Sequence, residues 1–334
     1  MANDFDSDPK KQFDIYIHDY LVKKNLPHVA EIFRKEAKMS DHSIRIDTSK
    51  VFLLDWWRSF YEYFGPNLEG IRQIFVWDVG TSCSYSTLTG HLSLITDIQF
   101  QQNSSIFASS SFDGTIKIWD AASPNQLLSN LFVGHSKAVH SLDFKSNNTL
   151  FSCDNTNQIT QWDLTQSTSY VSNVMRTASH IRIQPNHGKL LAFASGNEVG
   201  FFNTETREVL FTGKVHEKIV CLVCWDYDGD HIVSVSEDRV QVWSLSKGQC
   251  MYQLDSNGDH YQSCTIHPFY RHTWIIGGNK NLKLWNQKAG PKVLKVVAHG
   301  GDVTALAESL ETNMIASASD DQCVKLWQEK DINY

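Results

Sequence analysis

The sequence predicts an all-β propeller of six complete blades and a partial seventh, preceded by a small α-helical region. Two observations predict the propeller: an aromatic ending recurs at nearly constant spacing, and each interval holds runs in which apolar and polar residues alternate. As a third observation, apolar residues near the N-terminus repeat at helical spacing, which predicts the helices.

Composition limits the functional classes. The chain has 334 residues, of which 41% are hydrophobic and 20% charged, so it is expected to be globular. The net charge of −7 gives no excess of positive charge with which the chain would bind nucleic-acid phosphates directly. An odd number of cysteines, seven, and a polar N-terminus favour a reducing intracellular compartment. No apolar run approaches the length of a membrane helix, so no membrane partner is expected.

The repeat is defined by its aromatic endings, which are Trp77, Trp119, Trp162, Phe202, Trp243, Trp285 and Trp327. By subtraction these positions lie 42, 43, 40, 41, 42 and 42 residues apart. A period of about 40 to 45 residues is the size of one four-stranded propeller blade.

Each interval shows the same order of signals. A histidine precedes an alternating run such as residues 94–100, a second run of small and β-branched residues follows, and a tight aspartate turn leads into a strand that ends at the aromatic. The first ending, at residues 71–77, lacks the histidine and the first two strands. We expect an open ring in which residues 71–77 pair with residues 84–89. In the alternative, residues 84–89 form the outer strand of the last blade and close a ring of six.

These signals resemble WD40 repeats over residues 71 to 328. The resemblance implies a buried, hydrogen-bonded quartet of His, Ser, Asp and Trp in three blades: His91, Ser111, Asp113 and Trp119; His216, Ser236, Asp238 and Trp243; and His299, Ser319, Asp321 and Trp327. Three other blades depart from this pattern at Thr156, Gly196 and Asn279 and are expected to rely on packing. Because the trio of His, Ser and Asp recurs, a scaffold role is favoured over an acyl-transfer triad.

Two short amphipathic helices are predicted within residues 13 to 36, with Asn25 as a cap and Pro27 at the start of the second. Such short helices cannot bury their apolar stripe alone, which favours a four-helix dimer core. The stripe resembles the LisH dimerisation motif, and its candidate oligomerisation residues are Phe13, Ile17, Tyr20, Leu21, Leu26, Ala30 and Phe33. The alternative is a hairpin that packs on the chain's own propeller.

A third helical stripe lies at residues 53–64 and is rich in aromatic side chains, which suits an interface. It either forms an adaptor surface or completes the LisH core, and both can hold together. The candidate adaptor-binding residues are Trp56, Trp57, Phe60 and Tyr61.

The order of these parts resembles the plant LEUNIG-type transcriptional corepressors. The resemblance implies a nuclear protein, with the cytoplasm as a second compartment, that oligomerises, binds a SEUSS-like adaptor and receives transcription factors or repressor complexes through its propeller. This sequence departs from the family because the Gln-rich middle is absent and the first blade is shortened. The predicted regions are a disordered N-terminus (1–9), the LisH and aromatic-helix region (10–64), a linker (65–70) and the propeller (71–330).

Two alternatives to the corepressor scaffold remain: a substrate receptor of a cullin-type ubiquitin ligase, and a degenerate paralogue. Such receptors carry an Arg two residues past the Trp-Asp dipeptide, where this chain has Gly80, Ala122 and Thr165. Neither an enzyme nor a cofactor is expected, because no nucleotide-binding loop occurs. No metal is expected at Cys221 and Cys224, because residues three apart on a strand point to opposite faces.

The turns before the third strands predict a partner surface, because residues between the Ser and the Asp of a blade point out of that end of the propeller. The candidate contact residues are Phe112, Lys137, Asn155, Glu237 and Asp320.

Overall fold

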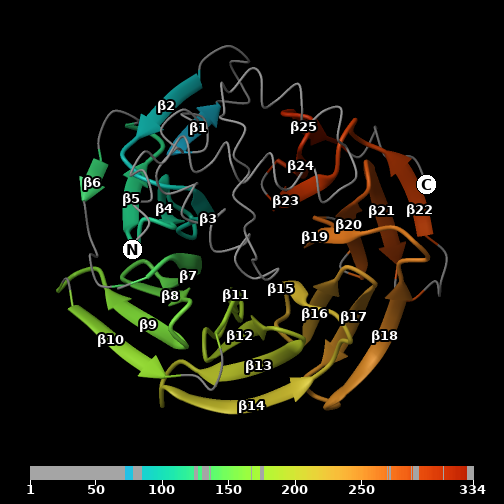
Figure 1. Ribbon diagram of the computed structural model, residues 1–334, viewed down its shortest axis with the longest axis horizontal. Coiled ribbons are helices and arrows are strands. Elements are labelled where there is room, and N and C mark those ends of the chain that lie inside the picture. Colours follow the sequence, from blue (N-terminus) through green and yellow to red (C-terminus); the bar gives the residue numbers. More distant parts are fainter. Residues whose placement is uncertain are drawn as a thin grey trace, which may run out of the picture. The chain divides into compact units, whose positions relative to one another are not determined.

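The computed structural model describes residues 72–77, 85–123, 127–129, 135, 137–166, 168–173, 177–268, 270, 272–286, 288, 293–310 and 312–328. The chain divides into two compact units after Asn67, and the second unit, Leu68–Tyr334, contains all of these residues. Within this unit the 25 described strands form antiparallel sheets that follow one another around a ring (Figure 1). The predicted WD40-type propeller is therefore confirmed.

Five blades have four strands, hydrogen-bonded in chain order. The first of these blades contains β3 (Ile95–Phe100), β4 (Ile106–Ser111), β5 (Ile116–Asp120) and β6 (Leu127–Ser129). The second contains β7 (Val139–Ser146), β8 (Thr149–Asp154), β9 (Gln158–Asp163) and β10 (Thr168–Asn173). The third contains β11 (His180–Ile183), β12 (Leu190–Ser195), β13 (Glu198–Asn203) and β14 (Glu208–Lys214).

The remaining blades continue the ring. The fourth contains β15 (Val220–Trp225), β16 (His231–Ser236), β17 (Arg239–Ser244) and β18 (Gln249–Asp255). The fifth contains β19 (Tyr261–Ile266), β20 (Thr273–Gly278), β21 (Asn281–Asn286) and β22 (Val293–Val297). The sixth has three strands, β23 (Val303–Ser309), β24 (Met314–Ser319) and β25 (Val324–Trp327). Within the described residues this blade thus has one strand fewer than the four predicted.

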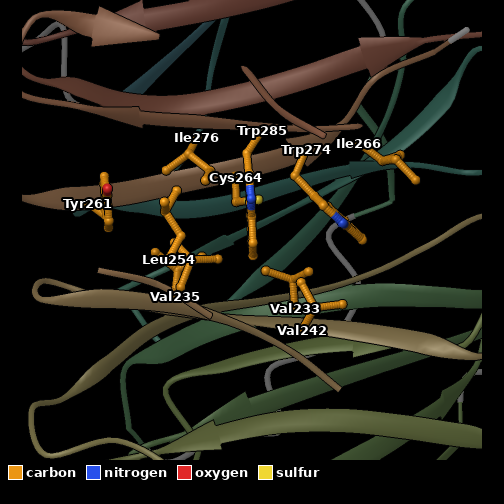
Figure 2. Packing of buried hydrophobic residues seen from close by; sticks show 11 residues of the cluster. Val233, Val235, Val242, Leu254, Tyr261, Cys264, Ile266, Trp274, Ile276 and Trp285 are labelled. Atoms are coloured by element: carbon orange, nitrogen blue, oxygen red, sulfur yellow. The ribbon is translucent and has the colours of Figure 1, made fainter. Parts of the chain in front are cut away.

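The second strand of each complete blade is the most deeply buried, because it lies between two neighbouring blades. In β4, β8, β12 and β16 every residue after the first is buried, which explains their small and β-branched composition. Figure 2 shows one junction, where Val233 and Val242 of the fourth blade pack against Trp274 of the fifth. Trp274 is fully buried there. Apolar packing between consecutive blades is therefore the main core of the ring.

The half-blade lies between the sixth and the first blade. Its strands β1 (Gln73–Trp77) and β2 (Tyr85–Thr89) pair with each other in register, as predicted. Ile74 and Leu88 cover Phe107 and Trp119 of the first blade. No described strand pairs with the outer edge of β25, so the alternative in which residues 84–89 complete the last blade is wrong.

The ring keeps its opening at this half-blade. Adjacent inner strands lie against one another from β3 through β7, β11, β15 and β19 to β23. The strands β23 and β3 would have to meet to close the circle, but they do not lie against each other as the other adjacent inner strands do. Among the described residues, the half-blade has no inner strands that would fill this place.

Candidate functional site

A hydrogen-bond chain in the first blade links its second and third strands. His91 Nδ1 lies 2.9 Å from Asp113 Oδ2, and His91 Nε2 lies 2.7 Å from Ser109 Oγ. Trp119 Nε1 donates to the same Ser109 Oγ at 2.8 Å. Burial raises the pKa of Asp113, but hydrogen bonds from His91, Thr115 and the Leu92 backbone outweigh it and hold this pKa well below its ordinary range. The ionised carboxylate therefore accepts from Nδ1, and the Ser109 hydroxyl donates to Nε2.

The serine of this tetrad differs from the predicted one. Ser111 bonds to neither His91 nor Trp119; its hydroxyl donates to the Ser93 carbonyl at 3.1 Å and accepts from the Asp113 backbone N–H at 3.1 Å. The prediction of Ser111 was wrong because the tetrad serine must face the tryptophan of the adjacent strand, whereas Ser111 lies at the turn. The same correction applies to the sixth blade.

In the sixth blade Ser317, and not Ser319, completes the tetrad. His299 Nδ1 lies 3.0 Å from Asp321 Oδ2, and His299 Nε2 lies 2.7 Å from Ser317 Oγ. Trp327 Nε1 donates to Ser317 at 2.9 Å. Ser319 instead accepts from the Asp321 backbone N–H at 3.2 Å, as Ser111 does from Asp113 in the first blade.

The second blade has a complete tetrad that the sequence prediction missed. His135 lies 2.7 Å from Asp154 and 2.6 Å from Ser152, to which Trp162 Nε1 donates at 2.8 Å. The prediction sought the aspartate at Thr156, but Asp154 ends β8 itself, two residues earlier. A usable signal was present, because the tetrad serine lies ten residues before the tryptophan in all three complete tetrads.

The fourth blade has an incomplete set. His216 Nε2 lies 2.7 Å from Ser234, and Trp243 Nε1 donates to Ser234 at 3.3 Å, so the predicted Ser236 was wrong here too. Asp238 accepts from Ser236 at 3.1 Å, and within the described residues His216 Nδ1 is buried without a hydrogen-bond partner. Burial lowers the pKa of His216 to about 4. This histidine is therefore neutral at pH 7.

These tetrads have no reactive geometry. Ser109 is fully buried and His91 nearly so. The Ser109 oxygen already contacts both His91 and Trp119, so no substrate carbonyl can approach it. The tetrads stabilise the blades and position the turns beside them.

The turns beside the tetrads bear the predicted partner surface. In the first turn Gly114 has a φ of +78°, and a Cβ there would lie 3.3 Å from the carbonyl oxygens of His135 and Lys137. All five predicted contact residues are exposed, namely Phe112, Lys137, Asn155, Glu237 and Asp320. Glu237 forms an ion pair with Lys218 at 3.0 Å. The residues are thus accessible, and their role in binding stays a prediction.

The inner strands enclose a central cavity of about 830 Å³. On its wall Arg182 Nη1 lies 2.9 Å from Asp97 Oδ2, and Ser141 donates to the same carboxylate at 2.6 Å. Burial raises the pKa of Asp97, but the charge of Arg182 outweighs it and lowers the value below its usual range. Burial raises the pKa of the adjacent Asp143 to about 6. This charge network joins the first three blades, and no sequence motif indicates it.

The cysteine pair also lines this cavity. Cys221 is exposed and Cys224 is half-buried. Although Cys221 is exposed as a residue, desolvation of its thiol raises the pKa to about 11, so the thiol is protonated at pH 7. Among the described residues no group of three or more His, Cys, Asp or Glu side chains could hold a metal ion. In the same part of the chain, no helix has the length and apolar character needed to cross a membrane.

Two groups of predicted site residues lie outside the described part of the chain. They are the oligomerisation residues Phe13, Ile17, Tyr20, Leu21, Leu26, Ala30 and Phe33, and the adaptor-binding residues Trp56, Trp57, Phe60 and Tyr61.

Two family models match the chain. The LisH-type SSDP dimerisation domain matches residues 13–66. The WD domain, G-beta repeat, matches residues 82–120, 126–163, 207–244 and 290–328. Together with the ring of blades, these matches define the chain as a WD40-repeat β-propeller protein that carries a LisH-type region.

Among known proteins the chain is similar to the transcriptional corepressor LEUNIG_HOMOLOG of Arabidopsis thaliana, with 40% identity over 262 residues. The alignment covers 77% of this chain and 32% of that relative. The predicted resemblance to LEUNIG-type corepressors is therefore confirmed.

Other similar proteins have lower identity. The nuclear distribution protein nudF of Aspergillus niger is 24% identical over 74% of this chain and 52% of its own length. Autophagy-related protein 16 of Arabidopsis thaliana is 28% identical over 58% of this chain and 39% of its own length. The chain thus spans about half or less of these relatives.

Proposed function

We propose that the chain is a non-enzymatic scaffold of a transcriptional corepressor that acts in the nucleus. The observation that carries this proposal is the presence, in one chain, of a LisH-type dimerisation match and a WD40 propeller, together with 40% identity to LEUNIG_HOMOLOG. With a net charge of −7, such a scaffold would reach DNA through other proteins.

In this proposal the two parts of the chain have separate tasks. The N-terminal region self-associates and binds a SEUSS-like adaptor through the aromatic stripe that includes Trp56 and Trp57. The exposed turns of the propeller receive transcription factors or repressor complexes. Buried aromatic anchors typically contribute about 2 kcal/mol or more at an interface, so the two tryptophans are the residues to test.

A tethering assay in plant cells tests the function. The full chain is fused to a heterologous DNA-binding domain, and expression of a reporter with the matching operator is measured. We expect repression, and we expect Trp56→Ala with Trp57→Ala to lose most of it, because these side chains would anchor the adaptor. The control Val297→Asp changes a side chain that is 78% exposed and should repress like the wild type. A fusion that is bound at the operator and leaves the reporter unchanged contradicts the corepressor role.

A further inference from the structure

Several junctions between blades follow one rule. In β5, β13, β17 and β21 the apolar residues one and three positions before the final aromatic of the strand pack on the next blade. In β21 these are Leu284 and Leu282, which are 2% and 1% exposed and pack on Val303 and Ile315 of the sixth blade. In β5 the equivalent residues Ile118 and Ile116 pack on the second blade in the same way.

The last third strand, β25, breaks this rule. Its equivalent residues Leu326 and Val324 are 47% and 48% exposed. The next place in the ring belongs to the half-blade, which among the described residues has no inner strands to cover them. Leu326 and Val324 are therefore exposed, whereas the equivalent residues at the β5 and β21 junctions are buried.

The opposite side of this place is also apolar and exposed. On β1, Phe75 and Trp77 are 42% and 55% exposed, and their rings stack with centroids 6.2 Å apart. On β3, Ile98 is 39% exposed, whereas its equivalent Leu142 in the second blade is fully buried against the preceding blade. We call the space between these two sides the notch; its sides are β25 and the exposed residues of β1 and β3.

Two further observations show what fits the notch. Among the described strands β1 pairs only with β2, so its other edge retains backbone donors and acceptors that no described strand uses. The central cavity has Ile98 on one wall and Val324 on another, so the notch opens into the cavity where inner strands would lie. The notch therefore has one open strand edge and two apolar walls. At the other junctions, the corresponding edge and walls are covered by a pair of antiparallel inner strands.

We propose that the notch binds a β-hairpin of another protein, whose two strands take the place of inner strands of the half-blade. One strand adds to the open edge of β1 through backbone hydrogen bonds. Both strands carry apolar side chains on the two faces, because the inner strands at the other junctions contact a blade on each side. The partner segment is therefore a β-hairpin with small and β-branched side chains along its strands, rather than a helix.

A fluorescent synthetic peptide with the sequence of residues 303–319 is the probe, because this hairpin packs on Leu282 and Leu284, the equivalents of the two exposed β25 residues. Its binding to the full chain is followed by fluorescence anisotropy. We expect saturable binding, and we expect Val324→Asp with Leu326→Asp to weaken it about tenfold or more, a change typical of lost interface anchors. A peptide of permuted sequence and the exposed-site variant Val297→Asp provide the controls.

Three results would overturn the proposal. In the first, the peptide does not bind, or binds the wild type and the double variant equally. In the second, the double variant lowers the thermal midpoint of the chain well below that of Val297→Asp, because the notch is then already covered by a segment of the chain itself. In the third, the double variant alone reduces the mass measured by light scattering, because the notch is then a contact between two copies.

Discussion

The tetrads solve a problem that each blade faces at the level of single residues. An indole N–H, a hydroxyl and an imidazole are buried together, and each needs a partner, since an unpaired buried polar group costs about 1 to 3 kcal/mol. In the second blade, hydrogen bonds run from Trp162 through Ser152 and His135 to Asp154. Each of these buried polar groups therefore has a partner. In the fourth blade the hydrogen-bond chain ends at His216, whose Nδ1 has no partner among the described residues. Asp238 there accepts from Ser236 of its own turn instead.

Truncation of the two aspartates should therefore have unequal effects. Asp154→Ala removes the carboxylate that His135 Nδ1 contacts inside the core, and we expect the free energy of unfolding to fall by about 1 to 3 kcal/mol. Asp238→Ala, which removes a bond to the Ser236 hydroxyl and leaves the bond between His216 and Ser234 in place, should cost clearly less. Urea unfolding of both variants measures the difference. Equal losses would mean that the tetrad bond to His135 stabilises the fold no more than the turn bond to Ser236 does.

At the level of strands, most of the architecture could be predicted. The alternating runs and the aromatic endings identified the strands, because period-two burial follows directly from packing between blades. The tetrad serines were misplaced because the prediction counted from the turn, whose length varies, and not from Trp119 or Trp162, whose position in the ladder is fixed. The ion pair between Asp97 and Arg182 could not be predicted, because it joins strands 85 residues apart whose facing depends on the curvature of the ring.

The half-blade gives a prediction at this level. Ile74 is 5% exposed and packs on the first blade, whereas its neighbour Phe75 is 42% exposed on the other face of β1. Ile74→Ala should destabilise the propeller by about 2 to 5 kcal/mol, the usual cost of such a truncation in a core. Phe75→Ala, which removes more atoms, should cost far less. Guanidinium unfolding measures both, and a larger loss for Phe75→Ala would show that β1 packs through the opposite face.

For the whole molecule, two kinds of incompleteness have the same consequence. The predicted N-terminal stripe is expected to be too short to bury itself, and the described part of the ring lacks two inner strands between β25 and β1. We propose that in both places another chain covers the apolar residues.

The measurement that tests this account most directly is the mass of the full chain in solution by light scattering at micromolar concentration. We predict a dimer or a higher oligomer, and we predict that Leu21→Asp with Phe33→Asp yields a monomer, because two buried charges on the predicted stripe oppose its association. The β-rich circular dichroism spectrum of the variant should match that of the wild type and so exclude unfolding of the propeller. A wild-type chain that has the mass of one copy would contradict the account.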